Sequence, residues 1–352
     1  MVHFRRYFYE ENHGFSDVTT YICSRLHTFR ERCDERSQGL IEKKINVMKK
    51  TYHLCLSAGD EVMFRDLEDY NRGFNCFAVA LYKTNSTGLV ESFMSTHMHL
   101  LVQTDSPKDF MMCLRIAYTM YFNKKYGHSG KLGEKLHFTM EVVGYHHILA
   151  AMSYILRNAL HHGVAPIPYA YPHCSANAIF MHEMGKRPEE NLLPQKSYYK
   201  HLGRSAEYPD SYKMNKSGVF LRESVLDIPQ VENLFVTPRS FNFYMTRKSS
   251  EEWMEEQKKD ANGAEPVSLT SIEKGVNLHS LDSMLIFENG KADYRKLSDI
   301  DLCTEIDRNI LPNYGKASVY QLSSEEKELI ANHLRNTLHL NAAQIRRCLA
   351  ML

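Results

Sequence analysis

Residues Phe93–Thr104 decide the fold and read FMSTHMHLLVQT, with His97 and His99 one residue apart. The apolar pattern predicts a strand over His97–Thr104. Residues two apart on a strand point to the same face, so both imidazoles converge on one point beside the sheet while Met98 faces the core. Two neutral imidazoles so placed can hold a divalent ion. The alternative, two adjacent surface histidines on a strand, is not excluded by the triplet alone.

Working outward from this strand, the chain alternates between short strands and amphipathic helices. The expected strands are Tyr52–Ser57, Leu89–Met94, His97–Thr104 and Leu136–Val143, and the expected helices are Asp66–Tyr82, Phe110–Tyr126 and Tyr145–Leu160. The Ser106-Pro107 step suits the start of the second helix. This order predicts an α+β fold of the ferredoxin-like kind, an antiparallel sheet with helices on one face, over residues 51–166.

The flanking regions differ in composition from this core. Residues 1–50 are polar and form an N-terminal extension, and residues 167–320 are a mixed middle region of unknown role in which Lys258–Glu265 looks like a linker. Residues 321–352 regain helical periodicity. Ser323–Thr337 reads as an amphipathic helix with a capping box formed by Ser323 and Glu326, and Asn341–Leu349 as a second short helix.

This C-terminal helical hairpin resembles the helix-turn-helix that often closes bacterial DNA-binding chains. On that interpretation Gln344, Arg346 and Arg347 lie on or beside a recognition helix and contact duplex DNA. The alternative is a helical hairpin that packs on the core. The sequence leaves both open.

Composition limits the class of protein. The chain has 352 residues, 43% of them hydrophobic and 24% charged, with a formal net charge of +1, which is typical of a folded protein without a uniformly basic surface. Eight dispersed cysteines without a C-x-x-C motif predict reduced thiols in a cytosolic protein. The apolar runs are too short for a membrane span. A local basic groove remains compatible with this charge balance.

Tyr154 and Asn158 are four residues apart, and so share one face of the last helix. A tyrosine hydroxyl, with a pKa of ~10, is a weak nucleophile at neutral pH. It becomes useful against a phosphodiester that a metal polarises, and an amide oxygen at i+4 can complete the shell of that metal. The alternative is a buried tyrosine and a polar residue near a helix end.

Three strings together, THMHLLVQT, YTMYFNKKYGHSGKL and MSYILRNALHHGV, resemble the REP-associated tyrosine transposases, single-tyrosine HUH enzymes of the small insertion-sequence type. The resemblance covers about Thr51–Val164. It implies that His97, His99 and Asn158 bind a divalent metal, Mg²⁺ or Mn²⁺, and that Tyr154 attacks DNA. Two positions depart from the family pattern: Ala159 replaces a proline, and Gly133 replaces an aromatic residue.

The resemblance implies cleavage and strand transfer of single-stranded DNA with hairpins through a covalent phosphotyrosine, without a nucleotide cofactor. Tyr145 is the rival nucleophile. Tyr118 and Tyr121 of the preceding helix are expected in the core or stacked on bases. The pairs His146-His147 and His161-His162 are expected on the surface or in contact with phosphate. Lys124, Lys125, Lys131 and Lys135 are expected either to line a phosphate groove or to form a solvated charged face.

Two further classes of function compete with the transposase or its domesticated relative. A non-catalytic regulator would grip hairpin DNA with the same fold, although it has no need of Tyr154. A rolling-circle initiator or relaxase commonly keeps more tyrosines or helicase motifs, which this sequence does not show. The expected location is the bacterial cytoplasm, on the nucleoid, and the expected state is a monomer or a homodimer.

Overall fold

The structure is a computed structural model that describes residues 49–59, 61–133, 136–203, 206–246, 258, 287–288, 291–292 and 297–351. The chain divides into two compact units, Met1–Met48 and Lys49–Leu352, and all of the described residues belong to the second. The N-terminal extension expected over residues 1–50 therefore lies outside the described residues except for its last two. The expected linker Lys258–Glu265 lies outside them except for Lys258.

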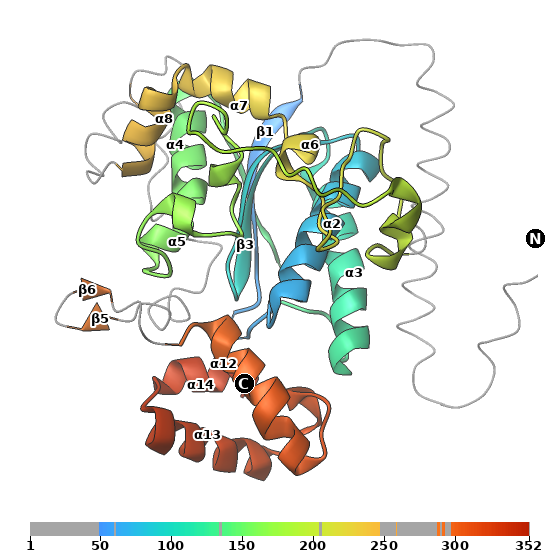
Figure 1. Cartoon of the computed structure of the whole chain (residues 1–352), viewed down its shortest axis with the longest axis vertical. Helices are drawn as coiled ribbons and strands as arrows, with labels where there is room; N and C mark the ends of the chain where they lie inside the picture. The colour runs from blue at the N-terminus through green and yellow to red at the C-terminus, as the bar shows by residue number, and fades with distance from the viewer. Residues whose placement is uncertain are drawn as a thin grey trace, which may run out of the picture. The chain divides into compact units, whose positions relative to one another are not determined.

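A four-stranded antiparallel sheet forms the centre of this unit (Figure 1). Its strands are β1 (Lys50–Ser57), β2 (Thr87–Phe93), β3 (His97–Thr104) and β4 (Phe138–Glu141), in the spatial order β2-β3-β1-β4. The predicted α+β class is confirmed. The predicted strand over His97–Thr104 matches β3 at both ends, because its alternating pattern is bounded by the polar turn at Ser95 and Thr96 on one side and by Pro107 soon after the other.

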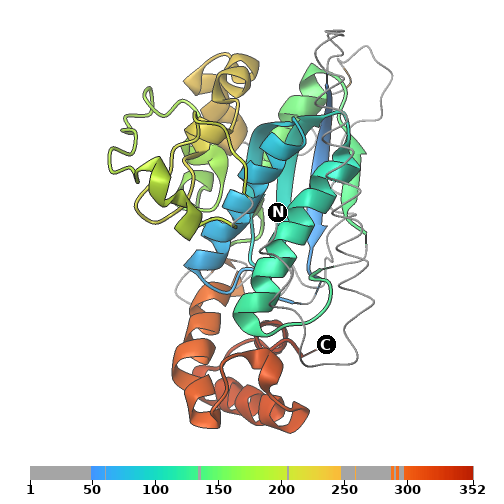
Figure 2. The same cartoon turned by 90° about the vertical axis from the view of Figure 1, so that its right-hand side faces the viewer.

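Helices cover both faces of the sheet, so the expectation of helices on one face is wrong. Helices α2 (Leu67–Lys83) and α3 (Pro107–Tyr126) lie side by side on one face, which we call the helix-pair face (Figure 2). Phe93, opposite Met98 in the register, places its ring against Phe74 and Phe77 of α2. Helix α4 (Tyr145–Leu156) packs on the other face, where His99 contacts Tyr154.

The reason for this two-sided cover lies in the sequence of β3. Met98, Leu100 and Val102 point to the helix-pair face, while His97, His99 and Leu101 point to the face under α4, and all six are fully buried. A strand that is buried on both faces needs a covering layer on each. We call the second face the histidine face.

The local signals that begin and end the helices are those expected from the sequence. Asp66 caps α2 in a capping box with Asp69, and Pro107 stands in the first turn of α3. Helix α3 ends at Gly127, whose φ of 62° is the left-handed conformation that glycine adopts without strain. These residues set where α2 and α3 begin and where α3 ends.

The middle region covers the edge of the sheet formed by β2. It contains η1 (Pro168–Ala170), η2 (Ser175–Asn177), η3 (Gln195–Lys200), α6 (Arg222–Val225), α7 (Ile228–Phe235) and α8 (Pro238–Thr246). The Phe93 amide donates to the His173 carbonyl at 2.8 Å, and the Asp227 amide donates to the Gly88 carbonyl at 2.9 Å. These bonds satisfy backbone groups that an open edge strand would leave exposed.

The end of the chain forms a helical segment with its own apolar core, which we call the C-terminal segment (residues 298–351). It comprises α12 (Asp299–Glu305), η4 (Ile306–Ile310), η5 (Leu311–Tyr314), η6 (Val319–Gln321), α13 (Ser324–Leu338) and α14 (Ala342–Cys348). The two predicted helices and the capping box of Ser323 and Glu326 are confirmed. The segment begins near residue 298 instead of 321, because Leu302, Cys303 and Ile306 belong to the same core.

A two-stranded hairpin, β5 (Phe287–Glu288) and β6 (Lys291–Ala292), precedes this segment. None of the helices in the described part of the chain is both long enough and apolar enough to cross a membrane.

Candidate active site

His97 and His99 stand on β3 in the middle of the histidine face, as their spacing predicts. Their ring centroids are 5.0 Å apart and nearly perpendicular, and both side chains are fully buried. The Thr96 hydroxyl lies 3.1 Å from His97 Nδ1. This contact occupies one ring nitrogen of His97 and directs the other, Nε2, toward α5.

Asn158 meets His97 across the gap between the sheet and the helix. Helix α4 ends at Leu156, Arg157 forms a cap, and α5 (Asn158–His161) continues the chain in almost the same direction. Asn158 Oδ1 lies 3.2 Å from His97 Nε2, although the two residues are 61 positions apart in sequence. The ring of Tyr154 lies 5.3 Å from that of His99. The structure therefore brings together His97, His99, Tyr154 and Asn158.

His53 is a fifth member of this cluster, and it was not among the residues expected there. It lies on β1 opposite Leu101, so its side chain is on the histidine face. His53 Nε2 lies 3.0 Å from His99 Nδ1, and the two rings stack with centroids 5.1 Å apart. Its position follows from the register between β1 and β3, which single-sequence patterns do not give. The only sequence signal is a histidine in the alternating pattern of β1.

His162 is the sixth member and corrects an expectation. It was expected on the surface or against phosphate, but it is only 3% exposed and its ring lies 5.8 Å from that of His97. His147, expected in the same role, is also buried. Adjacent residues on a helix diverge by about 100°, so only one of each pair can face the sheet, and in both pairs it is the second histidine that is buried. His161, its neighbour, is exposed as expected.

Burial holds these imidazoles neutral. Removal from water disfavours the charged form and lowers the pKa of His53 to about 3 and that of His97 to about 4. Burial and the neighbouring histidines hold the pKa values of His99 and His162 well below the ordinary range. Neutral imidazole is the form that binds metal ions.

Several buried nitrogens of the cluster have no hydrogen-bond partner among the described residues: His53 Nδ1, His99 Nε2, Asn158 Nδ2 and His162 Nε2. Leaving a buried polar group unsatisfied costs about 1–3 kcal/mol, so such groups are rare in folded proteins and call for an explanation. His99 Nε2 is notable because His53 engages the other nitrogen of the same ring. A neighbour that fixes one nitrogen of an imidazole while the other stays available is the usual surrounding of a metal-binding histidine.

The donor atoms suit a small divalent cation. Mg²⁺ binds its ligands at about 2.0–2.1 Å, so neighbouring ligands of an octahedral ion lie about 3.0 Å apart. The 3.2 Å between His97 Nε2 and Asn158 Oδ1 is a hydrogen-bond distance, and it is also close to that separation. Among the described residues, no group of three or more His, Cys, Asp or Glu side chains is placed to hold a metal ion. The candidate set consists of two imidazoles and one amide oxygen, so it contains only two side chains of those four types.

The expected phosphate-binding lysines have different surroundings. Lys125 Nζ is held by Asp66 at 2.7 Å, Asp69 at 2.8 Å and Glu68 at 3.2 Å, which makes it part of the packing between α2 and α3. Lys124 and Lys131 are exposed, and Lys135 lies outside the described residues.

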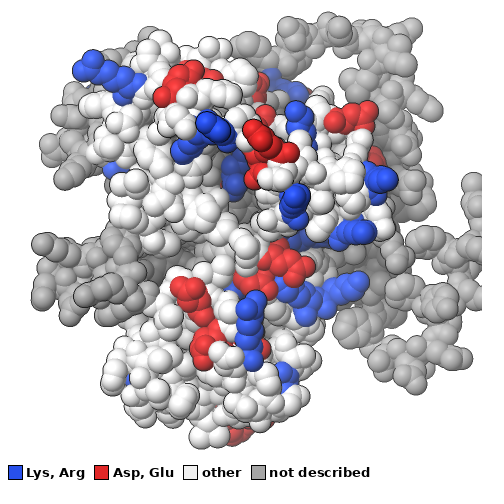
Figure 3. Space-filling model, viewed as in Figure 1, with Lys and Arg blue, Asp and Glu red and all other residues white. Residues whose placement is uncertain are grey.

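Lys124 and Lys125 line a groove of about 640 Å³ together with Arg72, Lys200 and His201. Basic side chains gather over the side where α2 and α3 lie, with acidic ones among them (Figure 3). This groove lies on the helix-pair face, whereas His97 and His99 lie on the histidine face.

The C-terminal residues expected to contact DNA are only in part exposed. Gln344 and Arg347 are buried and donate to Asp299, so the expectation that they read duplex DNA is wrong, and Arg346 alone of the three is exposed. The helix itself is confirmed, but its helical periodicity does not show which of its sides packs against α12. Tyr145, the rival nucleophile, is 43% exposed, and its hydroxyl donates to the Leu234 carbonyl.

Compared with protein-family models, curated proteins and solved structures, the chain matches none.

Proposed function

We propose that the protein is a metal-dependent enzyme that cuts and rejoins single-stranded DNA, an HUH single-tyrosine transposase or a domesticated relative, with Tyr154 as the nucleophile. One observation carries the proposal. The four residues that the resemblance assigns to catalysis come from β3 and from helices α4 and α5, far apart in the sequence, and they form one cluster on the histidine face. The element order β1-α2-β2-β3-α3-β4 agrees with the ferredoxin-like core of that family.

In this proposal His97 Nε2, His99 Nε2 and Asn158 Oδ1 hold Mg²⁺ or Mn²⁺. The ion, when bound, withdraws charge from the scissile phosphate. Thr96 and His53 orient the two imidazoles through their inner nitrogens. For His99 Nε2 to present its lone pair, Nδ1 must carry the proton and donate it to His53 Nε2. In the same way, His97 must carry its proton on Nδ1 and donate it in a hydrogen bond to the Thr96 hydroxyl. His97 Nε2 then has no proton, so it can no longer donate a hydrogen bond to Asn158 Oδ1.

Tyr154 performs the covalent step. Its oxygen loses the hydroxyl proton and forms a bond to phosphorus, while the bond from phosphorus to the leaving deoxyribose oxygen breaks and that oxygen takes up a proton. A hydroxyl of a second DNA strand then reverses the step. Because the phosphotyrosine conserves the energy of the phosphodiester, no nucleotide cofactor is required.

The histidine face is closed in this structure. Tyr154 is 4% exposed, and His97, His99 and Asn158 are fully buried. A phosphodiester therefore reaches the Tyr154 hydroxyl only after the groups that cover it have moved. In this proposal DNA binding must supply the free energy of opening.

This closure is also the observation that favours a second function, a non-catalytic regulator that binds hairpin DNA. In such a protein the groove beside Lys124 and Lys200 on the helix-pair face would hold phosphates, and the histidine face would stay closed. The two functions differ in one product, because only the enzyme becomes covalently attached to DNA.

The test is covalent adduct formation on labelled single-stranded DNA hairpins with Mn²⁺, followed on a denaturing protein gel. We expect an adduct with the wild type that disappears with EDTA and with Tyr154→Phe. Tyr145→Phe is the matched control, because it removes a hydroxyl from the same helix, and it should keep the adduct. Hairpin binding without any adduct would favour the regulator. An adduct that survives Tyr154→Phe would contradict the assignment of the nucleophile.

A further inference from the structure

The turn Met94–Thr96 joins β2 to β3 and ends immediately before His97. Its backbone is held from the core: the Ala58 amide donates to the Thr96 carbonyl at 2.8 Å, and the Met63 amide donates to the Ser95 carbonyl at 2.8 Å. The Ser95 hydroxyl of this turn donates to Asp299 Oδ2 at 2.6 Å, which links the turn to α12. The turn before His97 is therefore fastened on one side by the core and on the other by the C-terminal segment.

Asp299 is itself held rigidly. Arg347 donates to both of its carboxylate oxygens, from Nε at 2.7 Å and from Nη2 at 2.8 Å, and Gln344 Nε2 donates to Oδ1 at 3.1 Å. Arg347 is 2% exposed, and Asp299 and Gln344 are also buried. A bidentate guanidinium–carboxylate pair of this kind fixes the direction of the carboxylate as well as its charge. Asp299 thus reaches Ser95 from a fixed position in α12.

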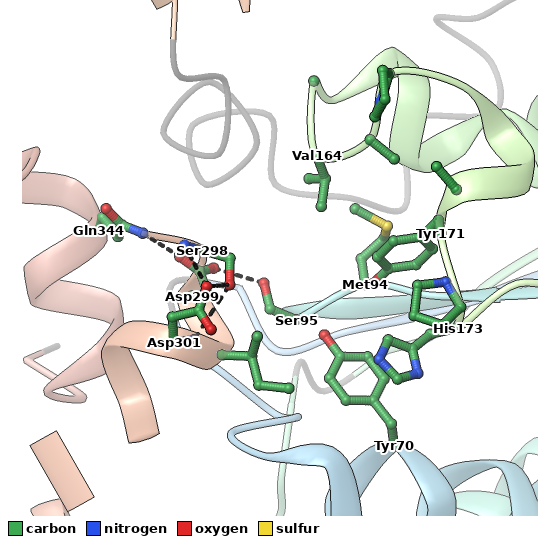
Figure 4. A pocket seen from close by; sticks show the side chains of 16 residues that line it. Tyr70, Met94, Ser95, Val164, Tyr171, His173, Ser298, Asp299, Asp301 and Gln344 are labelled. Atoms are coloured by element: carbon green, nitrogen blue, oxygen red, sulfur yellow. Dashed lines mark hydrogen bonds between the residues drawn. The ribbon is translucent and has the colours of Figure 1, made fainter. Parts of the chain in front are cut away.

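A cavity of about 360 Å³ lies beside this bond. Figure 4 shows Asp299 and Ser95 joined by a hydrogen bond, with Gln344 on the side of Asp299 away from Ser95 and Val164 above them in the view. The opposite wall is formed by Gly163–Pro166, which follows Asn158 and His162 in the chain. Because Ser95 lines this cavity, fewer neighbouring atoms pack against its side chain. The hydrogen bond to Asp299 therefore contributes more to the position of Ser95 than it would in a fully packed site.

Ser95 is coupled to His97 through Thr96. The Thr96 hydroxyl lies 3.1 Å from His97 Nδ1, and Thr96 is fully buried. A shift of the turn therefore moves the group that sets the orientation and the tautomer of the His97 ring. His97 Nε2, which lies 3.2 Å from Asn158 Oδ1, would move with it.

We propose that Asp299 is a positioning residue for His97, so that the C-terminal segment braces the turn that carries one proposed metal ligand. The brace explains why Gln344 and Arg347 point inward to Asp299. The consequence for metal binding rests on the proposed function, whereas the orientation of the His97 ring does not.

The test compares variants of the full chain that lose a hydroxyl of similar kind. Ser95→Ala removes the link to Asp299 but leaves Asp299 paired with Arg347, so the C-terminal segment keeps its structure. Ser318→Ala is the matched control: Ser318 is a buried serine of the same segment whose hydroxyl donates to the Tyr126 carbonyl at the end of α3, away from the turn. Ser95→Thr keeps the hydroxyl and serves as the conservative rescue.

Two readouts are used: Mn²⁺ affinity by calorimetry, and the ¹⁵N signals of the His97 ring in metal-free protein. Changes in groups that orient a metal ligand typically cost about 10- to 100-fold in affinity. We therefore expect Ser95→Ala to weaken Mn²⁺ binding by about 10-fold, near the lower end of that range. We also expect Ser95→Ala to shift the His97 signals. Ser318→Ala should change neither readout, and Ser95→Thr should restore both.

Equal losses of Mn²⁺ affinity in Ser95→Ala and Ser318→Ala would overturn the proposal, because they would reflect general destabilisation. Unchanged His97 signals in Ser95→Ala would also overturn it. If the wild type itself binds no Mn²⁺, or if His99→Leu binds as well as the wild type, the proposed metal site fails instead. The His97 signals of the metal-free variants then decide the positioning role alone.

Discussion

Two buried polar clusters lie at opposite ends of one short turn, and they differ in how their hydrogen bonds are satisfied. Around Asp299, both carboxylate oxygens accept bonds, from Arg347, Gln344 and Ser95. On the histidine face, nitrogens such as His99 Nε2 and His162 Nε2 have no partner among the described residues. Both clusters are as deeply buried as the apolar core.

This difference separates a structural role from a functional one. A fully satisfied buried network is stable and specifies one arrangement, whereas unsatisfied buried groups cost free energy that the rest of the fold must offset. A protein keeps such groups where a ligand or a reaction uses them. The difference supports the two proposals made above, a brace at the Asp299 cluster and a binding site on the histidine face.

The largest expected effect comes from breaking the satisfied cluster. Asp299→Ala should lower the free energy of unfolding by about 3–5 kcal/mol, because it removes the carboxylate that pairs with the buried guanidinium of Arg347. Urea denaturation of the full chain measures this. The double variant Asp299→Ala with Arg347→Met removes both charges and should recover a large part of the loss. A loss of under about 1 kcal/mol in the single variant would mean that the pair is hydrated and has no bracing role.

The next effect is expected when Mn²⁺ binds to the proposed ligands on the histidine face. At a free Mn²⁺ concentration of 100 times Kd, the free energy of unfolding should rise by about 2.7 kcal/mol, because the ion binds the folded state alone. Thermal unfolding with and without Mn²⁺ measures the rise. His99→Leu should abolish it. An equal rise in His99→Leu would place the ion elsewhere.

A smaller effect should appear when an unsatisfied group is removed. His162→Leu should raise the free energy of unfolding by about 1 kcal/mol, because it replaces a buried nitrogen without a partner by apolar surface of similar size. Gln344→Leu is the control from the satisfied cluster and should lower it, because its amide donates to Asp299 and to the Leu297 carbonyl. Denaturant unfolding of both variants tests the comparison, and a loss of stability in His162→Leu would contradict it.

The smallest effect concerns pH and a histidine outside both clusters. His173 stacks on Tyr70 with centroids 3.7 Å apart, and burial, followed by the charge of Arg222, lowers its pKa to about 3. The unfolded chain takes up a proton at its ordinary pKa of about 6.5, so folding stability falls as the pH drops through the window between these values. His173→Phe should flatten this dependence by at most about 1.4 kcal/mol per pH unit. Unfolding curves between pH 7 and pH 4 measure the slopes, and identical slopes would show that His173 is hydrated.

Elements with a strong local pattern could be predicted from the sequence. Strand β3 has the predicted bounds, and α13 begins one residue after the predicted cap because Ser323 and Glu326 form the expected capping box. His97, His99, Tyr154 and Asn158 came together as their spacing and the resemblance implied. In these cases the information is local, or is carried by a motif.

Features that depend on tertiary register could not be predicted. His53 joins the site only because β1 pairs with β3 in one register, and Gln344 and Arg347 turn inward only because α14 packs on α12. The cover on both faces of the sheet was missed for a related reason. A helix pattern shows which of its sides is apolar, but not which face of the sheet that side meets.

The most direct test of the central claim locates the DNA on the protein. Trypsin should release residues 136–157 as one peptide that holds both Tyr145 and Tyr154. After reaction with a single-stranded hairpin and Mn²⁺ followed by nuclease digestion, fragmentation of this peptide by mass spectrometry shows which tyrosine carries the nucleotide. The account predicts a nucleotide on Tyr154 and none on Tyr145. A nucleotide on Tyr145, or on a tyrosine outside this peptide, would contradict it.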